Sequence, residues 1–296
     1  MRERFSIRLI SFNEIPEVTN WARLEGFSPG MDDVSIYRNT DKQGVWVACL
    51  DNNPIGSIAC IKYNSSYGFI GLFIVKKEFR NNGYGVRLWK HALEYLKNVD
   101  CIGLEAAPDR LNDYEKWGFR KSSITTRWEL NGSQDMPLKN FYTDEFHSFK
   151  IVPGNEISSE AVLIYDDQRE PSPRPHFLND WLKNSHGNVS AIVDNNGMCH
   201  GFGRIRPCVL DNNEQGWRIG PLLADTPPLA ELLIRELVGD LDTQILLDCS
   251  NLNPYANYLL SSLGFEEISK TYRMYKGIQP FCPMNQVYGL ACLELG

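Results

Sequence analysis

The chain has 296 residues, of which 43% are hydrophobic and 23% charged. This composition is ordinary for globular proteins, and the length suits two domains. The formal net charge of −7 argues against nucleic acid as a partner, because binding a phosphate backbone depends on clustered Lys and Arg. No run approaches the roughly 18 apolar residues that a membrane-spanning helix needs, and the charged start resembles no secretory signal. We therefore expect a cytoplasmic protein that binds neither nucleic acid nor membranes.

The first half of the chain alternates predicted strands and helices. Short apolar runs between turn residues indicate strands, and apolar side chains at helical spacing after residue 85 indicate a helix. Glu25 and the pair Asp32-Asp33 are placed in the loop region before the first hairpin. In chain order, the predicted elements are strands at Val45–Leu50, Ile55–Tyr63 and Phe69–Val75, a helix at Val86–Leu96, a strand at Cys101–Ala106, a short helix through Tyr114 that ends at Gly118, and a closing strand at Lys121–Leu130.

The second half repeats this order. Ala191–Asp194 and Cys199–Ile205 form a hairpin like the first one. Gly264-Phe265 follows Gly118-Phe119 by 146 positions (264 − 118). A repeat of that length indicates a duplicated domain.

The polar and aromatic segment Asn131–Pro153 separates the two halves and is interpreted as the linker. The offset of 146 places a helix at Leu229–Leu237 and a strand near Ile245–Cys249 in the second half. We therefore expect an α/β protein of two tandem domains, residues 1–135 and 136–296.

Cysteine and histidine give no sign of a metal site. The eight cysteines form no Cys-x-x-Cys pair, and most lie in apolar runs such as Val45–Leu50. This favours reduced thiols packed as small hydrophobic side chains over zinc ligands or disulfides. The five histidines show no metal-ligand spacing either, so no metal is expected.

The most specific local feature is the sequence Arg80-Asn-Asn-Gly-Tyr-Gly85, between a predicted strand and a predicted helix. Glycines let successive backbone N–H groups turn toward one point, and the helix start adds free N–H groups and a positive dipole end. The loop is therefore predicted to bind a pyrophosphate. It is not a Walker loop, which ends in Gly-Lys-Ser/Thr, and it lacks the third glycine of a dinucleotide-binding fingerprint.

The pattern Arg-x-x-Gly-x-Gly after a strand, followed by Tyr114-Glu-Lys-Trp-Gly-Phe119, resembles the GNAT acetyltransferase superfamily. The resemblance implies a mixed, splayed sheet with acetyl-CoA between the strands Phe69–Val75 and Cys101–Ala106. It also implies that loop amides hold the pyrophosphate, while strand backbone lines the pantetheine arm. The cofactor-binding residues implied in this way are Ile74, Val75, Arg80, Asn81, Asn82, Gly83, Tyr84, Gly85 and Val86.

Further segments resemble a subgroup of GNAT proteins with two tandem domains, of which the second is degenerate. The resemblance covers nearly the whole chain. Phe27 and Ser28 stand where the subgroup is expected to have Trp and Asn, which leaves the amine substrate open. The matching segments are Glu25–Gly30, Tyr67–Gly71, Glu105 before Pro108, Trp217–Asp225, Asn253 and Tyr272–Tyr275.

Acyl transfer from a thioester to an amine needs a base for the ammonium, a donor for the oxyanion and a proton for the thiolate. An open amide near Ile74–Val75 is a candidate oxyanion donor. Tyr114 occupies the family's tyrosine position and is the candidate acid, since a phenol stays neutral at pH 7. For the base we favour Glu105, at the end of an apolar strand where ligands bind in open α/β sheets. Glu25 and the pair Asp32-Asp33 are the alternatives.

The second half lacks the anion-binding loop. At the offset of 146, Thr226 stands against Arg80 and Leu229 against Gly83. The replacement segment Asp225–Leu229 contains two prolines, which remove two N–H donors, and Leu260 stands where Tyr114 would be. We therefore expect one cofactor site per chain, and a second domain that completes the substrate cleft or forms an interface between chains.

These observations together predict an N-acetyltransferase that passes an acetyl group from acetyl-CoA directly to a primary amine. Direct attack is favoured because no Cys or Ser stands in a nucleophile–base arrangement. The alternative is an acyl-CoA-binding sensor or scaffold without turnover. A longer acyl donor stays open, as does an acceptor that is a small metabolite, an aminoglycoside-like compound, a polyamine or a protein amine.

Overall fold

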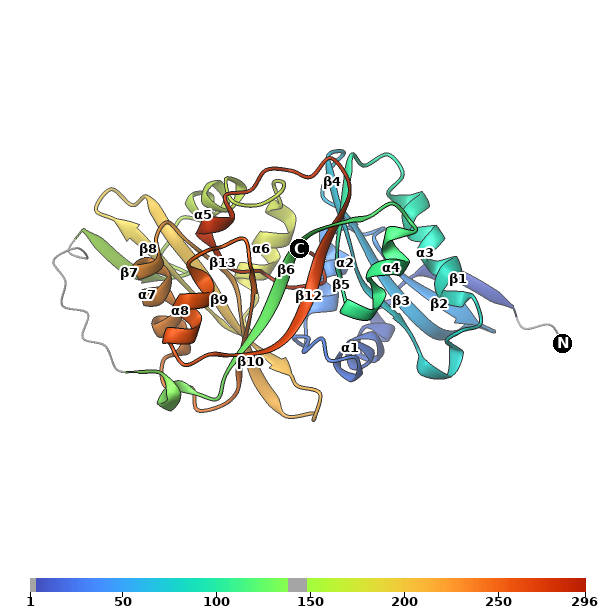
Figure 1. Ribbon diagram of the computed structural model, residues 1–296, viewed down its shortest axis with the longest axis horizontal. Helices are drawn as coiled ribbons and strands as arrows, with labels where there is room; N and C mark the ends of the chain where they lie inside the picture. The colour runs from blue at the N-terminus through green and yellow to red at the C-terminus, as the bar shows by residue number, and fades with distance from the viewer. Residues whose placement is uncertain (1–3, 138–147) are drawn as a thin grey trace.

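The computed structural model describes residues 4–137 and 148–296. Its strands form one mixed sheet that runs through the whole molecule (Figure 1). The order is β1-β2-β3-β4-β5-β12-β6-β11-β10-β9-β8-β7, with β13 beside β10. The strands are β1 (Phe5–Leu9), β2 (Val45–Leu50), β3 (Asn53–Lys62), β4 (Tyr67–Val75), β5 (Cys101–Ala106), β6 (Arg120–Leu130), β7 (Phe149–Pro153), β8 (Asn188–Asp194), β9 (Cys199–Val209), β10 (Gln215–Ala224), β11 (Ile245–Ser250), β12 (Glu266–Gly277) and β13 (Val287–Gly289).

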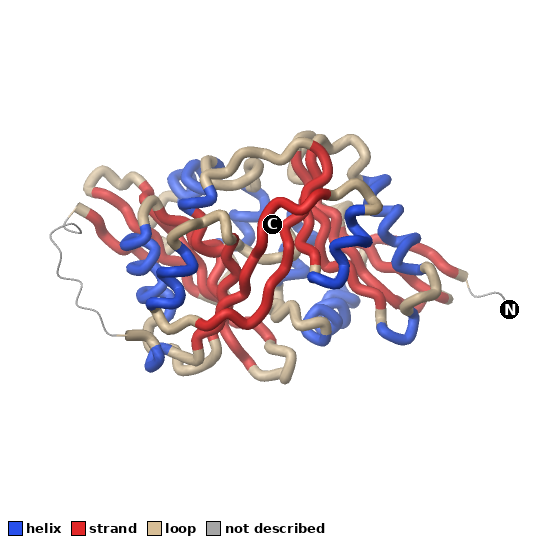
Figure 2. The backbone as a smooth tube through the Cα atoms, in the orientation of Figure 1, coloured by secondary structure: helices blue, strands red, loops and turns tan. Residues whose placement is uncertain are grey.

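Helices cover both faces of this sheet (Figure 2). In the first half, α1 and α2 pack on one face of β2–β4, and α3 and α4 pack on the other. In the second half, α5 and α6 lie on one face, and α7 and α8 on the other. The helices are α1 (Ile15–Leu24), α2 (Asp33–Thr40), α3 (Tyr84–Tyr95), α4 (Leu111–Glu115), α5 (Ser159–Asp167), α6 (Pro175–Lys183), α7 (Pro227–Val238) and α8 (Ala256–Ser262).

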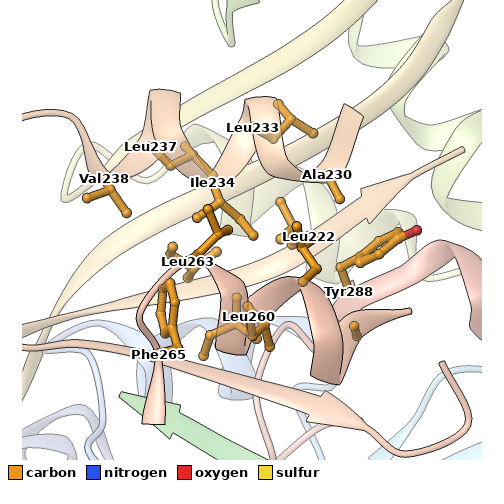
Figure 3. Close-up of a cluster of buried hydrophobic side chains, with 14 of the residues drawn as sticks. Leu222, Ala230, Leu233, Ile234, Leu237, Val238, Leu260, Leu263, Phe265 and Tyr288 are labelled. Atoms are coloured by element: carbon orange, nitrogen blue, oxygen red, sulfur yellow. The ribbon is translucent and has the colours of Figure 1, made fainter. Parts of the chain in front are cut away.

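The core of the second half shows why its elements form. The side chains of Leu233, Ile234 and Leu237 follow helical spacing along one face of α7. They point toward Leu222 of β10 and toward α8, where Leu260 contributes to the same cluster (Figure 3). The predicted helix Leu229–Leu237 and the predicted hairpin of the second half are thereby confirmed, as is the α/β fold with a mixed sheet flanked by helices.

Two helices flank the predicted loop region that contains Glu25 and Asp32. The residues before Val45 form β1, α1 and α2, and residues 25–32 connect the two helices. Helix α1 has Pro16 in its first turn and buries Ile15, Val18 and Trp21 against the sheet. This spacing of three residues is a helical signal that the sequence carries, and Pro is favoured in a first turn. Glu25 and Asp32 thus lie in the connecting segment, whereas Asp33 is the first residue of α2 and not part of a loop.

The closing strands of the two halves are exchanged. Strand β6 of the first half does not pair with β5; it pairs with β11 and β12. Strand β12 of the second half lies between β5 and β6, antiparallel to both. Each half therefore completes its sheet with a strand from the other. The predicted strand Lys121–Leu130 exists, but its neighbour is set by contacts more than 100 residues apart, which a local pattern does not encode.

The described part of the predicted linker Asn131–Pro153 includes a strand. Strand β7 occupies Phe149–Pro153 and pairs with β8 at the far edge of the sheet. Residues 138–147 of the predicted linker lie outside the described residues.

Candidate active site

The first half contains a splay between two parallel strands. Strands β4 and β5 pair from Tyr67↔Cys101 to Ile70↔Leu104 and no further. Leu72 has a φ of 50°, which marks a local irregularity, and the Ser57 hydroxyl donates to its carbonyl at 3.1 Å. Beyond Ile70, no described strand pairs with this edge of β4.

Backbone groups on this edge of β4 face the splay. The N–H of Lys76 donates to the carbonyl of Ile55 on β3 at 2.9 Å. Because successive residues of a strand direct their backbone groups to opposite sides, the N–H of Val75 points away from β3, into the gap. An extended ligand can therefore add to β4 as a strand would.

The loop from Arg80 to Gly85 ends in an uncapped helix start. Gly83 has a φ of 79°, and no side chain caps α3. The first helical hydrogen bond runs from the N–H of Arg87 to the carbonyl of Gly83 at 3.2 Å. The N–H groups of Tyr84, Gly85 and Val86 therefore have no backbone partner within the helix. Together with the helix dipole, these N–H groups could hold an anion.

The side chain of Arg80 shapes the loop. Its Nε donates to the carbonyl of Val75 at 2.7 Å, and its Nη2 donates to Glu25 Oε1 at 2.6 Å. Glu25, at the end of α1, is therefore the counter-ion of Arg80. The structure brings these two predicted site residues together at the loop, where the carboxylate already accepts from a cation.

Gly85 fits a closely bound ligand. A Cβ built there would meet only Phe73 Cζ at 3.6 Å and Val75 Cγ2 at 3.5 Å, which are ordinary contacts. No positive φ requires glycine at this position either. Packing of the protein therefore does not explain the glycine, and the position has room for a closely bound ligand. These residues fit the predicted acyl-CoA.

Tyr114 lies on the face of the sheet covered by α3. Its ring packs 5.1 Å from that of Trp89, which in turn lies 5.5 Å from Phe73 on β4. Burial raises the pKa of Tyr114 to about 12. The phenol is therefore neutral at pH 7 and donates hydrogen bonds.

Glu105 is held in a buried ion pair. Arg273 on β12 donates through Nε to Glu105 Oε1 at 2.6 Å, and the hydroxyls of Thr125 and Thr271 donate at 2.9 and 2.8 Å. The Glu105 side chain is only 3% exposed. Its lone pairs are thus occupied by a cation and two hydroxyls, which argues against a direct role as the base.

Two arginines, one on β6 and one on β10, hold the segment between α1 and α2. Arg218 donates through Nη1 to the carbonyl of Phe27 at 3.0 Å. Arg127 of β6 donates to the carbonyl of Gly26 at 3.0 Å. Asp248 on β11 accepts from both arginines. Burial raises the pKa of Asp248, but the guanidiniums of Arg127 and Arg218 lower it further, to about 2 overall.

The two aspartates considered as alternative bases belong to this anchoring. Asp33 is 2% exposed and accepts two hydrogen bonds from Arg206, at 3.0 and 2.8 Å. Asp32 lies against His186 and Asn184. Neither is a free carboxylate in the cleft. The sequence does contain a sign of these buried ion pairs. Arg206 in β9 and Arg218 in β10 are charged residues within otherwise apolar strands.

Among the described residues of the second half, the positions that correspond to the loop differ. Helix α7 begins with two prolines. Asp225 accepts from Tyr165 and Arg169 and contacts His200.

The chain itself fills the second splay. Strands β10 and β11 pair only from Trp217↔Ile245 to Ile219↔Leu247. Beyond that point β13 pairs with β10, with Leu222 opposite Gly289. The N–H of Leu290 then donates to the carbonyl of Asp248 on β11 at 2.8 Å. In the described part of the second half, the edge of β10 that corresponds to the open edge of β4 is therefore occupied.

Seven of the eight cysteines are buried and all are free thiols, as the apolar runs around them predicted. Among residues 4–137 and 148–296, no group of three His, Cys, Asp or Glu side chains is placed to hold a metal ion. Within the same residues, no helix combines the length and apolar character needed to cross a membrane.

Comparisons with known proteins agree with this geometry. The acetyltransferase (GNAT) family matches residues 12–119, and an acetyltransferase (GNAT) domain matches residues 162–289. A holothin acyltransferase from Pseudoalteromonas sp. (strain SANK 73390) is 26% identical over 288 residues, covering 97% of this chain and 92% of that protein.

Solved structures share the fold along the whole chain. A proposed acetyltransferase from Pyrococcus horikoshii has a TM-score of 0.79 at 22% identity, with 99% of this chain and 96% of that chain covered. A tandem GNAT protein from the clavulanic acid biosynthesis pathway has a TM-score of 0.62 at 13% identity, with 95% and 100% covered.

Proposed function

Because the chain belongs to the GNAT superfamily of acyltransferases, with one GNAT domain in each half, we propose that it transfers an acetyl group from acetyl-CoA to a primary amine. The observation that carries this proposal is the coincidence of two features in the first half. An uncapped helix start presents the N–H groups of Tyr84–Val86, and the open edge of β4 leads away from it. A pyrophosphate and an extended arm are the two parts of CoA that these features fit.

Each reacting group has a counterpart in the chain. The thioester supplies an electrophilic carbonyl, and we assign the N–H of Val75 as donor to its oxygen. Tyr114 donates a hydrogen bond to the departing sulfur. With a pKa of about 12, Tyr114 is a weaker acid than a thiol, whose pKa is about 8.5. The phenol therefore stabilises the thiolate mainly by hydrogen bonding.

Glu105 and Glu25, the predicted bases, receive positioning roles in this proposal. Each accepts from an arginine at 2.6 Å. Glu25 fixes Arg80 and with it the loop; Glu105 fixes Arg273 and with it β12. The amine then loses its proton to water or to another group in the cleft.

The second half shapes the cleft. We propose residues 1–135 as the catalytic domain and residues 136–296 as a degenerate partner, joined by the exchanged strands β6 and β12. Its arginines anchor the segment between α1 and α2, which borders the splay. In this proposal the second domain has kept its fold and lost its acyl-CoA site to β13.

Release of free thiol from acetyl-CoA, measured across a panel of amines, tests the proposed function. Holothin belongs in the panel because the relative's name gives it as that protein's acceptor. Propionyl-CoA and longer acyl-CoA donors test the preference for acetyl. Thiol release that depends on an amine, with the N-acetyl product seen by mass spectrometry, supports the proposal. Binding of acetyl-CoA without turnover on any amine supports the sensor alternative instead.

A further inference from the structure

A pocket of about 140 Å³ lies where the two halves meet. Its walls come from β6, from β12, from the segment after α5 and from the loop that follows β12. In Figure 1 that loop crosses from the end of β12 to the second half. The side chains that matter below are Ser123, Thr125, Glu170, Arg273, Tyr275 and Phe281.

Arg273 lines this pocket, and its guanidinium has an unused donor. Arg273 is 6% exposed, and its Nε is taken by Glu105. Its Nη2 is buried and has no hydrogen-bond partner among the residues that the structure describes. A buried guanidinium N–H without a partner costs free energy, which a bound oxygen would recover. A carboxylate matches the two-pronged geometry of this group.

Arg273 also borders the splay of the first half. It lies opposite Glu105 in the sheet, and Glu105 follows Leu104, the last β5 residue that pairs with β4. Because neighbouring strands are about 4.8 Å apart, Arg273 on β12 lies one strand spacing from Glu105 on β5. The guanidinium carbon lies 4.9 Å from the centre of the Phe69 ring on β4. A small molecule held at Arg273 therefore lies beside the strand that lines the splay.

A carboxylate faces the same pocket. Glu170 accepts from Arg174 through Oε1 at 2.7 Å, while no described residue donates to its Oε2. Burial raises the pKa of Glu170 to about 7, and its charged neighbours are Arg174, Asp166 and Arg273. The pocket thus offers a cation for a negative group and a carboxylate for an ammonium.

We propose that this pocket binds the acyl acceptor, and that the acceptor is a small amine that also carries a carboxylate, held at Arg273. The inference rests on the proposed function for its chemistry, since it names the substrate class of the same reaction. The small volume excludes a folded protein or a large glycoside from the pocket itself.

Matched pairs of amines test this inference by direct binding. Calorimetry on the full chain at low ionic strength compares β-alanine with propylamine, and γ-aminobutyrate with butylamine. The carboxylate-bearing member of a pair is expected to bind roughly tenfold more tightly or better, the size of a hydrogen bond to a charged group. Equal affinity within both pairs, or no binding by any of the four compounds, overturns the inference.

Substitutions that change the charge of an exposed residue at the pocket test whether the pocket binds a carboxylate, and they leave the core intact. Phe281 is 90% exposed and lines the pocket, while Ile278 is 86% exposed and does not. Phe281→Asp should weaken binding of the amino acids severalfold, Phe281→Lys should strengthen it, and Phe281→Asn and Ile278→Asp should leave it unchanged. Insensitivity to charge at position 281 contradicts a carboxylate site.

Arg273→Lys keeps the charge and removes the planar fork, so it should abolish the preference for carboxylate-bearing amines. If this variant fails to fold, the Phe281 series decides. Binding of acetyl-CoA is measured on the same preparations. In the parent protein, absence of acetyl-CoA binding would overturn the proposed function, whereas normal acetyl-CoA binding without amino-acid selectivity would overturn only this inference.

Discussion

Glu105 on β5 and Arg273 on β12 form an ion pair of 2.6 Å across the junction of the two halves. The first residue precedes the second by 168 positions, yet the two lie directly opposite each other in the sheet. The side chains are 3% and 7% exposed. This pair fixes the exchanged strand β12 against the strand that borders the splay, so the second half takes part in building the cleft of the first.

Removing the charge of Glu105 should destabilise the fold. In Glu105→Gln, the buried guanidinium of Arg273 loses its counter-charge, and breaking a buried pair costs about 3–5 kcal/mol. Urea unfolding of the variant should show this loss, whereas Glu115→Gln, at an exposed position of α4, should unfold like the parent. If Glu105→Gln instead kept full stability and lost kcat a hundredfold, Glu105 would be the catalytic base.

Asp248 should contribute stability that disappears in acid. Its pKa is about 2 in the folded chain against an ordinary value of 3.8. A lowered pKa means that the stabilisation is fully present above about pH 4 and is lost as the pH falls toward 2. The difference corresponds to about 2 kcal/mol.

The matching variant is Asp248→Asn. At pH 7 it should lower the free energy of unfolding by about 3–5 kcal/mol, because Arg127 and Arg218 stay buried without their carboxylate. Urea unfolding between pH 2 and pH 7 should show the gap between parent and variant narrowing below pH 4. Asp240→Asn, at an exposed position, serves as the control. A gap that stays constant down to pH 2 would contradict the assigned pKa.

The sequence was sufficient for the elements of the first half from Val45 onward, because they depend on local patterns. Short apolar runs between turn residues fix strands such as β3, and the left-handed Gly83 fixes the turn into α3. The partner of β6 was not predictable in this way. Its side-chain pattern suits any central strand, and the choice between β5 and β11 depends on pairs such as Arg127 with Asp248.

The same reason limited the assignment of catalytic carboxylates. Sequence position placed Glu105 and Glu25 near the cleft but did not show that each accepts from an arginine. An acid at the end of an apolar strand has the same local pattern whether it is free or paired. Only the fold brings Arg273 and Arg80 to them.

Two neighbouring glycines of the loop should respond differently to alanine. Gly83 has a φ of 79°, so Gly83→Ala should cost about 1–2 kcal/mol of stability. Gly85 has no such strain and room for a Cβ. Gly85→Ala should therefore fold normally but weaken acetyl-CoA binding tenfold or more, since the methyl group would occupy space left for the pyrophosphate.

Gly197 provides the control for strain alone. Its φ is 80°, and a Cβ there would meet nothing within 4 Å, as at Gly83. Gly197→Ala should lose stability like Gly83→Ala and keep the parent affinity for acetyl-CoA. Thermal unfolding and calorimetry separate the two effects. Unchanged affinity in Gly85→Ala would show that the loop does not hold the cofactor.

Tyr114→Phe should lower kcat about tenfold or more, the size of the lost hydrogen bond to a charged thiolate. The phenyl ring keeps the packing on Trp89, so stability and the affinity for acetyl-CoA should change little. Tyr258→Phe, at a side chain that is 81% exposed, is the control. Steady-state kinetics at saturating amine and donor give the readout. Parent-like turnover in Tyr114→Phe would remove the phenol from the reaction.

One acetyl-CoA should bind per chain, although the chain has two GNAT domains. The only open strand edge of this kind among the described residues is that of β4, because β13 occupies the corresponding edge of β10. The measurement needs the full chain, since a fragment that starts after residue 135 would lack β6, the neighbour of both β11 and β12. Calorimetry should give a stoichiometry of one acetyl-CoA per chain. Gly85→Ala should weaken this binding. A second binding event that survives in Gly85→Ala would place a site in the second half and would require β13 to leave its position beside β10.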